Sequence, residues 1–167
     1  MLRIGIGTDL HRLVAGRPLI LGGVRIAAEC GAIGHSDADA LAHAVIDAIL
    51  GALCEGDIGT HFPDHDAKLK DADSLDLLAR VVWLMGERGY QVGNVDATIH
   101  LEKPKLRPHI DAMRENLARI LGIEMACVSV KAKTGEGLDA VGRGEAVASQ
   151  AVVLLKAAGG RDATVIH

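Results

Sequence analysis

The stretch LRIGIGTDLH, residues 2–11, decides the fold of this chain because it predicts a β-strand that carries reactive side chains. Apolar residues alternate with arginine and glycine along its first half: Leu2, Arg3, Ile4, Gly5, Ile6 and Gly7. This period of two residues is typical of a strand, which we expect to continue to His11. Asp9 and His11 are two residues apart, so on a strand they point to the same face. Because zinc accepts both ligand types, they predict part of a metal site, although an Asp and a His that face water give the same pattern.

Two further elements are expected directly after this strand. Residues 19–26 contain two short apolar runs around a Gly-Gly pair, which predicts a β-hairpin. A helix is then predicted to begin at Ser36 or Asp37 and to run to about Leu53. Its apolar positions recur at helical spacing: Leu41, Val45, Ile49 and Ala52.

The helix also supplies candidates for a third metal ligand. His35 lies where the helix begins, and His43 lies two turns into it, so either imidazole is able to meet Asp9 and His11. Spacing alone does not choose between the two histidines. Asp39 and Asp47 lie four residues from His43, one on each side. If His43 is the ligand, either carboxylate is a candidate to orient its second ring nitrogen.

The remaining sequence predicts a compact α+β domain. Further elements are expected as a helix from Ser74 to Gly89, a strand over 90–101, a helix over 106–121 and a strand that begins at Val128. Residues 145–156 fit a helix or a strand, and the run VVLL at 152–155 favours a buried strand. We therefore predict one domain over 1–157, with a mixed four-stranded sheet packed against three helices plus an N-terminal hairpin, and a frayed tail over 158–167.

Composition excludes several classes of function. The net charge of −4 and the presence of only three aromatic residues argue against a nucleic-acid-binding protein, which needs basic charge and stacking surfaces. No apolar run reaches the roughly 20 residues that span a bilayer, so no membrane partner is expected. Three cysteines without a paired spacing, and no signal-peptide core at the N-terminus, predict reduced thiols in the cytoplasm.

Three other segments are candidates for binding phosphate or sugar hydroxyls. A helix N-terminus near Ser36 attracts phosphate, although ordinary capping explains the same residues. Asp57 and Asp64 lie in a long polar loop, where they suit hydroxyls, a divalent ion or the backbone of their own turns. The segment KAKTGEG, residues 131–137, places lysines, a hydroxyl and a carboxylate at a glycine-containing turn that suits phosphate and magnesium.

Together these segments resemble one family. The chain contains I-G-x-G-x-D-x-H, G-H-S-D-x-D, D-I-G-x-x-F-P-D and V-K-A-K-T-x-E, in this order. It is similar to the 2-C-methyl-D-erythritol 2,4-cyclodiphosphate synthases of the non-mevalonate isoprenoid pathway, from about Arg3 to Lys156. The resemblance implies a homotrimer with active sites at the subunit interfaces. It also implies a phosphorus-oxygen lyase that converts 4-diphosphocytidyl-2-C-methyl-D-erythritol 2-phosphate to the cyclic diphosphate and CMP.

The resemblance also implies a set of site residues. Zinc is expected on Asp9, His11 and His43, and magnesium or manganese on Glu136. Catalytic roles are expected for Asp9, His11, His43, His35, Lys133 and Thr134. Contacts with the substrate phosphates are expected from His35, Ser36, Lys133 and Thr134. Further substrate contacts are expected from Asp57, Gly59, Asp64, Leu101, Glu102, Lys103, Pro104, Lys105, Leu106, Thr134, Glu136 and Arg143.

The chain departs from the family pattern at one position. Relatives often carry phenylalanine where this chain has Ala140, beside an apolar cavity on the threefold axis. The resemblance therefore does not extend to binding of an isoprenoid diphosphate in that cavity. Two other functions remain as alternatives. One is a metal-dependent phosphohydrolase, and the other is a non-enzymatic oligomer that binds such ligands.

Overall fold

The computed structural model describes residues 1–63, 65–66 and 69–158 of the chain. Asp64 and nearly all of the predicted tail therefore lie outside the described residues. The strands are β1 (Leu2–Ala15), β2 (Leu19–Leu21), β3 (Val24–Ile26), β4 (Cys30–Ala32), β5 (Tyr90–His100), β6 (Val128–Lys133) and β7 (Ala146–Ala157). The helices are α1 (Ala40–Leu53), α2 (Ile58–His61), α3 (Ser74–Glu87), α4 (Ile110–Leu121) and α5 (Asp139–Gly142), with 3-10 turns at Arg107–His109 and Met125–Cys127.

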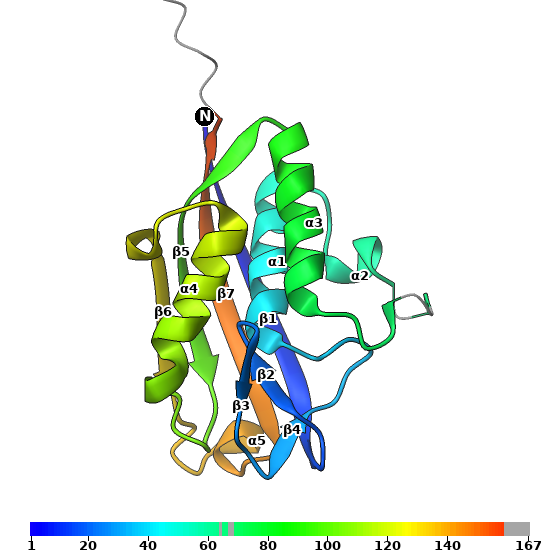
Figure 1. Ribbon diagram of the computed structural model, residues 1–167, viewed down its shortest axis with the longest axis vertical. Coiled ribbons are helices and arrows are strands. Elements are labelled where there is room, and N and C mark those ends of the chain that lie inside the picture. The colour runs from blue at the N-terminus through cyan, green and yellow to red at the C-terminus, as the bar shows by residue number, and fades with distance from the viewer. Residues whose placement is uncertain (64, 67–68, 159–167) are drawn as a thin grey trace, which may run out of the picture.

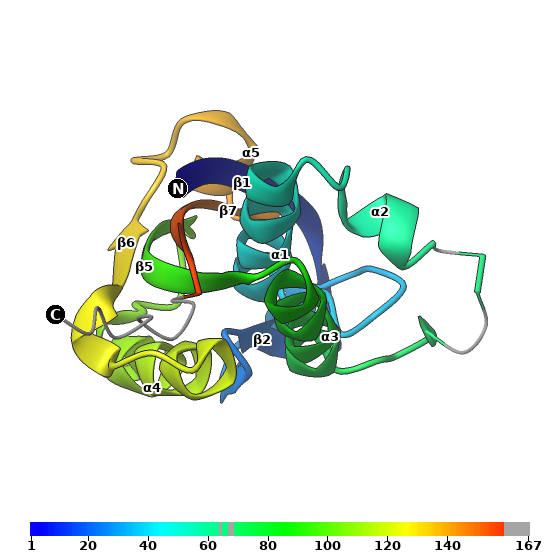
Figure 2. The ribbon, with the colours of Figure 1, turned by 90° about the horizontal axis from the view of Figure 1, so that it is seen from above.

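The main sheet has the strand order β4-β1-β7-β5-β6. Its β5–β6 pair is parallel and its other pairs are antiparallel, so the predicted mixed sheet is confirmed. It has five strands rather than four, because the short β4 pairs with the end of β1. Helices α1, α3 and α4 cover one face of this sheet, as Figures 1 and 2 show.

Strand β7 lies at the centre of the sheet and resolves the ambiguity of residues 145–156 in favour of a strand. It pairs with β1 along one edge and with β5 along the other. A central strand with one face against the helices needs inward apolar residues at every second position. Val147, Ala151, Val153 and Leu155 meet this need and are fully buried, while the buried Ser149 takes the inward position between Val147 and Ala151.

Glycine, not isoleucine, faces the helices from β1. A Cβ atom at Gly5 would overlap with the backbone carbonyl oxygen of Ala48, and one at Gly7 would overlap with that of Ala44. The bare glycine surface therefore lets α1 approach the strand closely. Ile4 and Ile6 point away from the helices and are 72% and 59% exposed.

Helix α1 begins later than the sequence indicated. Its N-cap is Asp39, not Ser36 or Asp37, and the Asp39 carboxylate accepts hydrogen bonds from the backbone N–H groups of Leu41 and Ala42. The same carboxylate also accepts from Gly22 and Gly23 at the turn of the β2–β3 hairpin. One buried side chain thus satisfies orphan amides of the helix and fixes the hairpin against it.

The hairpin turn itself requires glycine. Gly22 and Gly23 have φ of 58° and 70°, the left-handed conformation that a two-residue turn of this kind needs at both positions. The predicted β-hairpin at residues 19–26 is confirmed. None of the helices in the described part of the chain combines the length and apolar character needed to cross a membrane.

Candidate metal centre and substrate pockets

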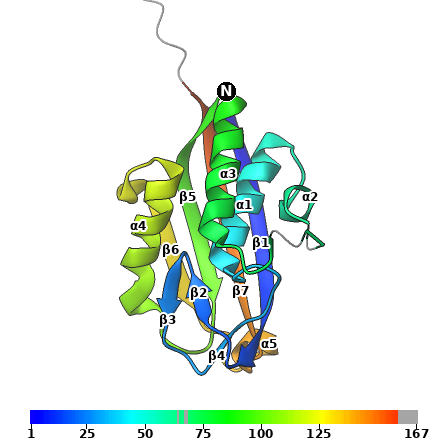
Figure 3. The ribbon, with the colours of Figure 1, turned by 45° about the vertical axis from the view of Figure 1, so that its right-hand side comes forward.

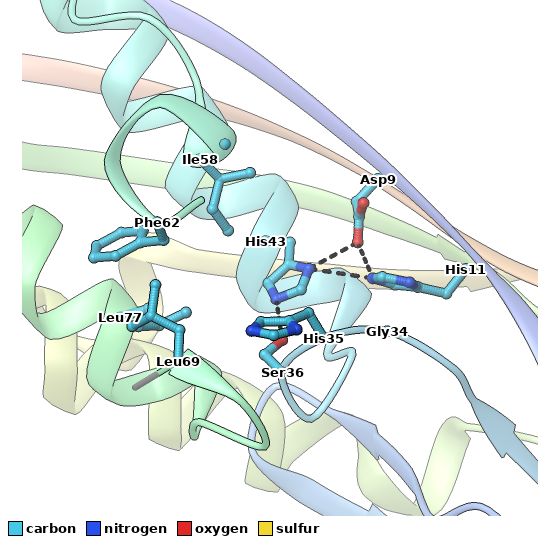
Figure 4. Close-up of a pocket in the computed structure, with 11 residues that line it drawn as sticks. Asp9, His11, Gly34, His35, Ser36, His43, Ile58, Phe62, Leu69 and Leu77 are labelled. Carbon is cyan, nitrogen blue, oxygen red and sulfur yellow. Dashed lines mark hydrogen bonds and ion pairs between the residues drawn. The ribbon is translucent and has the colours of Figure 1, made fainter. Parts of the chain in front are cut away.

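Three side chains from two elements converge on one point (Figure 4). Asp9 and His11 project from the same face of β1, and His43 projects from α1, which packs on that strand. The Asp9 Oδ2 atom lies 2.8 Å from His11 Nε2 and 3.1 Å from His43 Nδ1, and the two nitrogens lie 3.2 Å apart. Their ligand atoms form a group that is able to hold a metal ion, and His35 is not a member of it.

The geometry of this cluster fits a tetrahedral cation. Ligand atoms at zinc distances of about 2.0–2.1 Å in a tetrahedron lie roughly 3.3 Å from one another. The three distances in the cluster are 2.8 to 3.2 Å, so the side chains need only open slightly around an ion. Two imidazoles and one carboxylate leave the fourth position open, which is the arrangement of a catalytic rather than a structural zinc site.

Electrostatics in the metal-free cluster favour charge on both Asp9 and His11. Burial alone raises the pKa of Asp9, but its interactions with His11 and, to a smaller degree, with His43 outweigh burial and hold that pKa well below its usual range. Burial likewise lowers the pKa of His11, but the hydrogen bond and charge of Asp9 and the carbonyl of Ile33 raise it overall. Because metal ligands must be deprotonated, a cation bound at this point would compete with the proton on His11.

The second ring nitrogens of the two histidines also have partners. His11 Nδ1 lies 3.1 Å from the carbonyl oxygen of Ile33. His43 Nε2 lies 2.9 Å from Ser74 Oγ and 3.1 Å from Ser36 Oγ. In the sequence Ser74 stands out only as the start of a predicted helix, because tertiary packing is what brings α3 beside α1.

The prediction that Asp39 or Asp47 orients the second ring nitrogen of His43 is wrong. Asp39 is the cap of α1 and its carboxylate turns toward backbone amides, while Asp47 accepts from the backbone N–H of Ile58 at 2.7 Å. Each carboxylate meets a free N–H group in its own surroundings, so neither reaches the ring of His43. Asp47 instead fixes the start of α2 against α1.

A cavity of about 390 Å³ opens beside the cluster. Its polar wall consists of Asp9, His11, Gly34, His35, Ser36 and His43. Its apolar wall consists of Ile58, Gly59, Phe62, Leu69 and Leu77, from α2, α3 and the loop between them. A site of this kind suits a ligand with phosphate groups at one end and carbon atoms at the other.

Other expected site residues lie around this cavity with partners of their own. His35 Nε2 lies 3.2 Å from the carbonyl oxygen of Asp66, across the pocket loop. Asp57 is the N-cap of α2 and accepts from both the backbone and the hydroxyl of Thr60. The interpretation of Asp57 as a turn residue is therefore correct, and its contact with substrate stays a prediction.

A second cavity, of about 420 Å³, lies where β5 and β6 end. Its walls contain Leu101, Pro104, Lys105, Leu106, Arg107, Ala132, Lys133, Thr134 and Glu136. Glu102 accepts from the backbone N–H of Gly135 at 3.0 Å, which joins the two loops that form it. Glu136 accepts from the Thr134 hydroxyl at 2.7 Å, so the expected phosphate and magnesium residues lie together here.

The two cavities are far apart within one chain. Asp9 on β1 and Ala132 on β6 lie in one row of paired residues across the sheet, three strand spacings apart. With strands about 4.8 Å apart, this separation is roughly 14 Å.

Arg143 is not a member of the metal cluster and donates to both carboxylate oxygens of Glu145 at 3.1 and 3.2 Å.

The fold and the metal cluster together define the class of this protein. It is an α+β domain with a candidate catalytic metal site in a pocket between a strand and a helix. The chain belongs to the YgbB family, whose model matches residues 2–156. It is 59% identical over 157 residues to the 2-C-methyl-D-erythritol 2,4-cyclodiphosphate synthase of Salinibacter ruber, covering 94% of this chain and 100% of that one. The resemblance found in the sequence motifs is confirmed.

Solved structures show the same fold. A CDP-bound form of 2C-methyl-D-erythritol-2,4-cyclodiphosphate synthase matches with a TM-score of 0.86 and 40% identity, over 92% of this chain and 100% of that chain. The bifunctional IspDF from Campylobacter jejuni matches with a TM-score of 0.90 and 40% identity over 94% of this chain. The chain spans 42% of that bifunctional protein.

Proposed function

We propose that this chain is a cyclising, CMP-releasing lyase, a 2-C-methyl-D-erythritol 2,4-cyclodiphosphate synthase. It converts 4-diphosphocytidyl-2-C-methyl-D-erythritol 2-phosphate to 2-C-methyl-D-erythritol 2,4-cyclodiphosphate and CMP. The observation that carries this function is the Asp9–His11–His43 cluster at the wall of the first pocket, in a chain that shares this fold and family.

The reaction requires alignment and charge neutralisation more than it requires a reactive side chain. The 2-phosphate attacks the β-phosphorus, the bond from that phosphorus to the oxygen bridging the α-phosphorus breaks, and CMP leaves. Nucleophile and electrophile belong to one molecule, so no covalent protein nucleophile is needed. A phosphate is already ionised at neutral pH, so no general base is needed either.

The first pocket is proposed to hold the reacting phosphates. Asp9, His11 and His43 hold the cation, for which zinc is the proposed identity. Bound there, zinc supplies Lewis-acid polarisation of a phosphoryl oxygen. His35 and Ser36 line the same wall and are proposed to position the attacking phosphate. The methylerythritol carbons are proposed to lie against the apolar wall, near Gly59 and the Asp57 and Asp64 segment.

The second pocket is proposed to hold the cytidine and its diphosphate. Leu101, Pro104 and Leu106 give this pocket apolar walls, and the backbone of residues 101–106 is proposed to contact the base. Lys133 neutralises phosphate charge, and Glu136 with Thr134 is proposed to hold magnesium or manganese near the leaving CMP. Arg143 is proposed as a further substrate contact.

A homotrimer is the proposed assembly. One substrate molecule must reach both a metal pocket and a nucleotide pocket, and within one chain strands β7 and β5 lie between the β1 and β6 residues of these pockets. A pocket of each kind from neighbouring chains is able to meet at an interface. An exposed apolar sheet face, formed by Leu2, Ile4, Ile6, Leu10 and Val152, supports such an interface.

The cytoplasm is the proposed location, in keeping with the free thiols of Cys30, Cys54 and Cys127. Ala140 removes one apolar side chain from the proposed threefold axis, so we do not propose an isoprenoid diphosphate as a ligand. The alternative phosphohydrolase is distinguished by its product, inorganic phosphate rather than CMP.

The test is product analysis of purified protein with matched variants. Wild-type protein is expected to release CMP and a cyclic diphosphate, detected by mass spectrometry. His43→Ala is expected to lose bound zinc and to reduce turnover at least 100-fold, because it removes one of three protein ligands. Glu136→Gln is expected to weaken magnesium activation while it retains zinc.

His61→Gln is the control, because His61 lies in α2 outside the metal cluster. Wild-type turnover by His43→Ala would reject the metal assignment. Equal zinc loss in His43→Ala and Glu136→Gln would mean that the two metals are assigned to the wrong residues. Release of inorganic phosphate without CMP would replace the lyase with a phosphohydrolase.

A further inference from the structure

We propose that Ser74 and Asp37 are positioning residues for the metal site. A chain of hydrogen bonds runs from the Asp37 carboxylate through the Ser74 hydroxyl to the imidazole of His43. It fixes the tautomer of His43 that leaves Nδ1 free to bind a cation. This inference rests on the proposed function in one respect, that the Asp9–His11–His43 cluster holds a metal ion.

Ser74 is held firmly enough for such a role. It is fully buried at the first position of α3. Its hydroxyl donates to Asp37 Oδ1, and its backbone N–H donates to Asp37 Oδ2 at 3.2 Å. The hydroxyl is not needed to cap α3, because Asp73 is the N-cap and accepts from the backbone N–H of Leu75.

The direction of each hydrogen bond follows from the groups present. An ionised carboxylate only accepts, so Asp37 receives the Ser74 hydroxyl proton. Ser74 then has only lone pairs to offer to His43 Nε2, which lies 2.9 Å away. The proton of the neutral imidazole therefore lies on Nε2, and the lone pair of Nδ1 points toward Asp9 and His11.

Asp9 acts against this arrangement. Its Oδ2 lies 3.1 Å from His43 Nδ1, and a carboxylate at that distance favours a proton on Nδ1. A proton there must leave before a cation binds. Ser74 and Asp37 draw the proton to the opposite side of the ring, so they act before the metal arrives. Ser36 Oγ also lies 3.1 Å from Nε2 and accepts from the backbone N–H of Ala38. Its own proton has Ser74 Oγ, 3.4 Å away, as an acceptor, so Ser36 is able to accept from Nε2 as well.

The other histidine ligand shows why Asp37 is needed. His11 Nδ1 faces the carbonyl oxygen of Ile33 at 3.1 Å, and a carbonyl is always an acceptor. In the neutral ring of His11, that contact holds the proton on Nδ1 and opposes Asp9, whose Oδ2 lies 2.8 Å from Nε2. A serine hydroxyl is able to donate or to accept, so Ser74 fixes His43 only when a carboxylate takes its proton. Partners of this kind typically change metal affinity 10- to 100-fold when removed.

The decisive experiment measures the tautomer and the zinc affinity separately. Nitrogen-15 NMR of the imidazoles in metal-free protein, at about pH 8.5 where an ordinary imidazole is neutral, reports which nitrogen carries the proton. Wild-type His43 is expected to be protonated on Nε2. In Ser74→Ala we expect a shift toward the Nδ1-protonated form and zinc affinity about 10- to 100-fold weaker by competition with a chelator.

Ser149→Ala is the matched control, because Ser149 is buried and its hydroxyl has no hydrogen-bond partner among the described residues. It is expected to leave the tautomer and the zinc affinity unchanged. Asp37→Asn keeps the Ser74 hydroxyl but weakens its orientation, so a smaller loss of zinc affinity is expected. This second variant decides the question if Ser74→Ala does not fold.

Wild-type tautomer and wild-type zinc affinity in Ser74→Ala, or in Asp37→Asn if only that variant folds, would overturn the proposal. Failure of the wild-type protein to bind zinc would instead count against the proposed function of the cluster. In that case the tautomer of His43 in metal-free protein still decides the role of Ser74. The two failures are therefore distinguishable.

Discussion

His11 is surrounded by groups that favour its protonated form while no metal is bound. The Asp9 carboxylate lies 2.8 Å from its Nε2, and the Ile33 carbonyl oxygen lies 3.1 Å from its Nδ1. Burial acts in the opposite direction, but the net effect raises the pKa of His11 above 6.5. The same interaction lowers the pKa of Asp9 below 3.8. The pair therefore links the stability of the metal-free protein to pH.

At the residue scale we predict that metal-free protein loses stability as the pH rises above about 6.5. A group with a raised folded-state pKa contributes fully below its unfolded value, 6.5 for His11, and its contribution disappears as the pH passes the raised value. Urea unfolding in the presence of a chelator, from pH 6 to pH 9, measures this loss. His11→Gln is expected to flatten the slope, and His61→Gln is expected to keep it. A slope that His11→Gln leaves unchanged would contradict the prediction.

Strand β1 and helix α1 together hold all three metal-binding side chains, so their separation sets the geometry of the site. Gly5 and Gly7 allow this close approach because a side chain at either position overlaps with the backbone of α1. Asp9 and His11 follow on the same strand, and His43 lies beside Ala44 on the helix. A change in the spacing of these two elements is therefore also a change at the cluster. Figure 3 shows α1 lying along β1 and β7.

At the element scale we predict that Gly7→Ala destabilises the fold by about 3 kcal/mol or more, because overpacking here meets backbone rather than a flexible side chain. Zinc affinity is expected to fall as well, because α1 must move away from β1. Gly86→Ala in α3 is the control, since a Cβ there has no neighbour within 4 Å. It is expected to be neutral or to stabilise by about 0.5–1 kcal/mol. Chemical denaturation and chelator competition measure both effects, and a Gly7→Ala protein with wild-type stability and zinc affinity would contradict the prediction.

Over the whole molecule the outer sheet face divides into two parts. The part formed by β1 carries exposed Ile4 and Ile6, with 72% and 59% of their surface accessible. The part formed by β5 and β6 is polar and includes an exposed Asp96–Lys131 ion pair. Helices α1, α3 and α4 cover the opposite face of the sheet (Figure 2). Contiguous apolar surface of this kind marks an interaction site, and the proposed homotrimer places a second copy of the chain against it.

At the scale of the assembly we predict that Ile6→Glu converts a trimer to monomers. A charge on each copy of a buried apolar interface has no partner and loses its water. Activity per chain is expected to fall at least 100-fold, because each proposed active site needs two chains. Trp83→Glu is the control, since Trp83 is 68% exposed on α3, away from this face. Sedimentation velocity measures the oligomer, and a trimeric, fully active Ile6→Glu protein would contradict the prediction.

The sequence by itself determined the elements and the chemistry they carry. Alternation in residues 2–11, the Gly-Gly hairpin and the helical spacing around His43 each depend on local patterns of period two or 3.6, and all three elements are present. The sequence also predicted that Asp9 and His11 point to the same side, because a strand places alternate residues on one face. The motifs, taken together, indicated the family that the comparisons confirm.

Tertiary structure alone decided which distant groups meet. Residue spacing left His35 and His43 open and the family resemblance implied His43, whose ring the packing of α1 on β1 brings to Asp9 and His11. The role of Ser74 beside His43 and the use of Asp39 as an anchor for the hairpin depend on how α1, α3 and the hairpin pack. The exposed face of β1 is another such case, because its glycines rather than its isoleucines face the helices. Local patterns report the backbone conformation of a segment, whereas contacts between segments depend on close packing that no single segment contains.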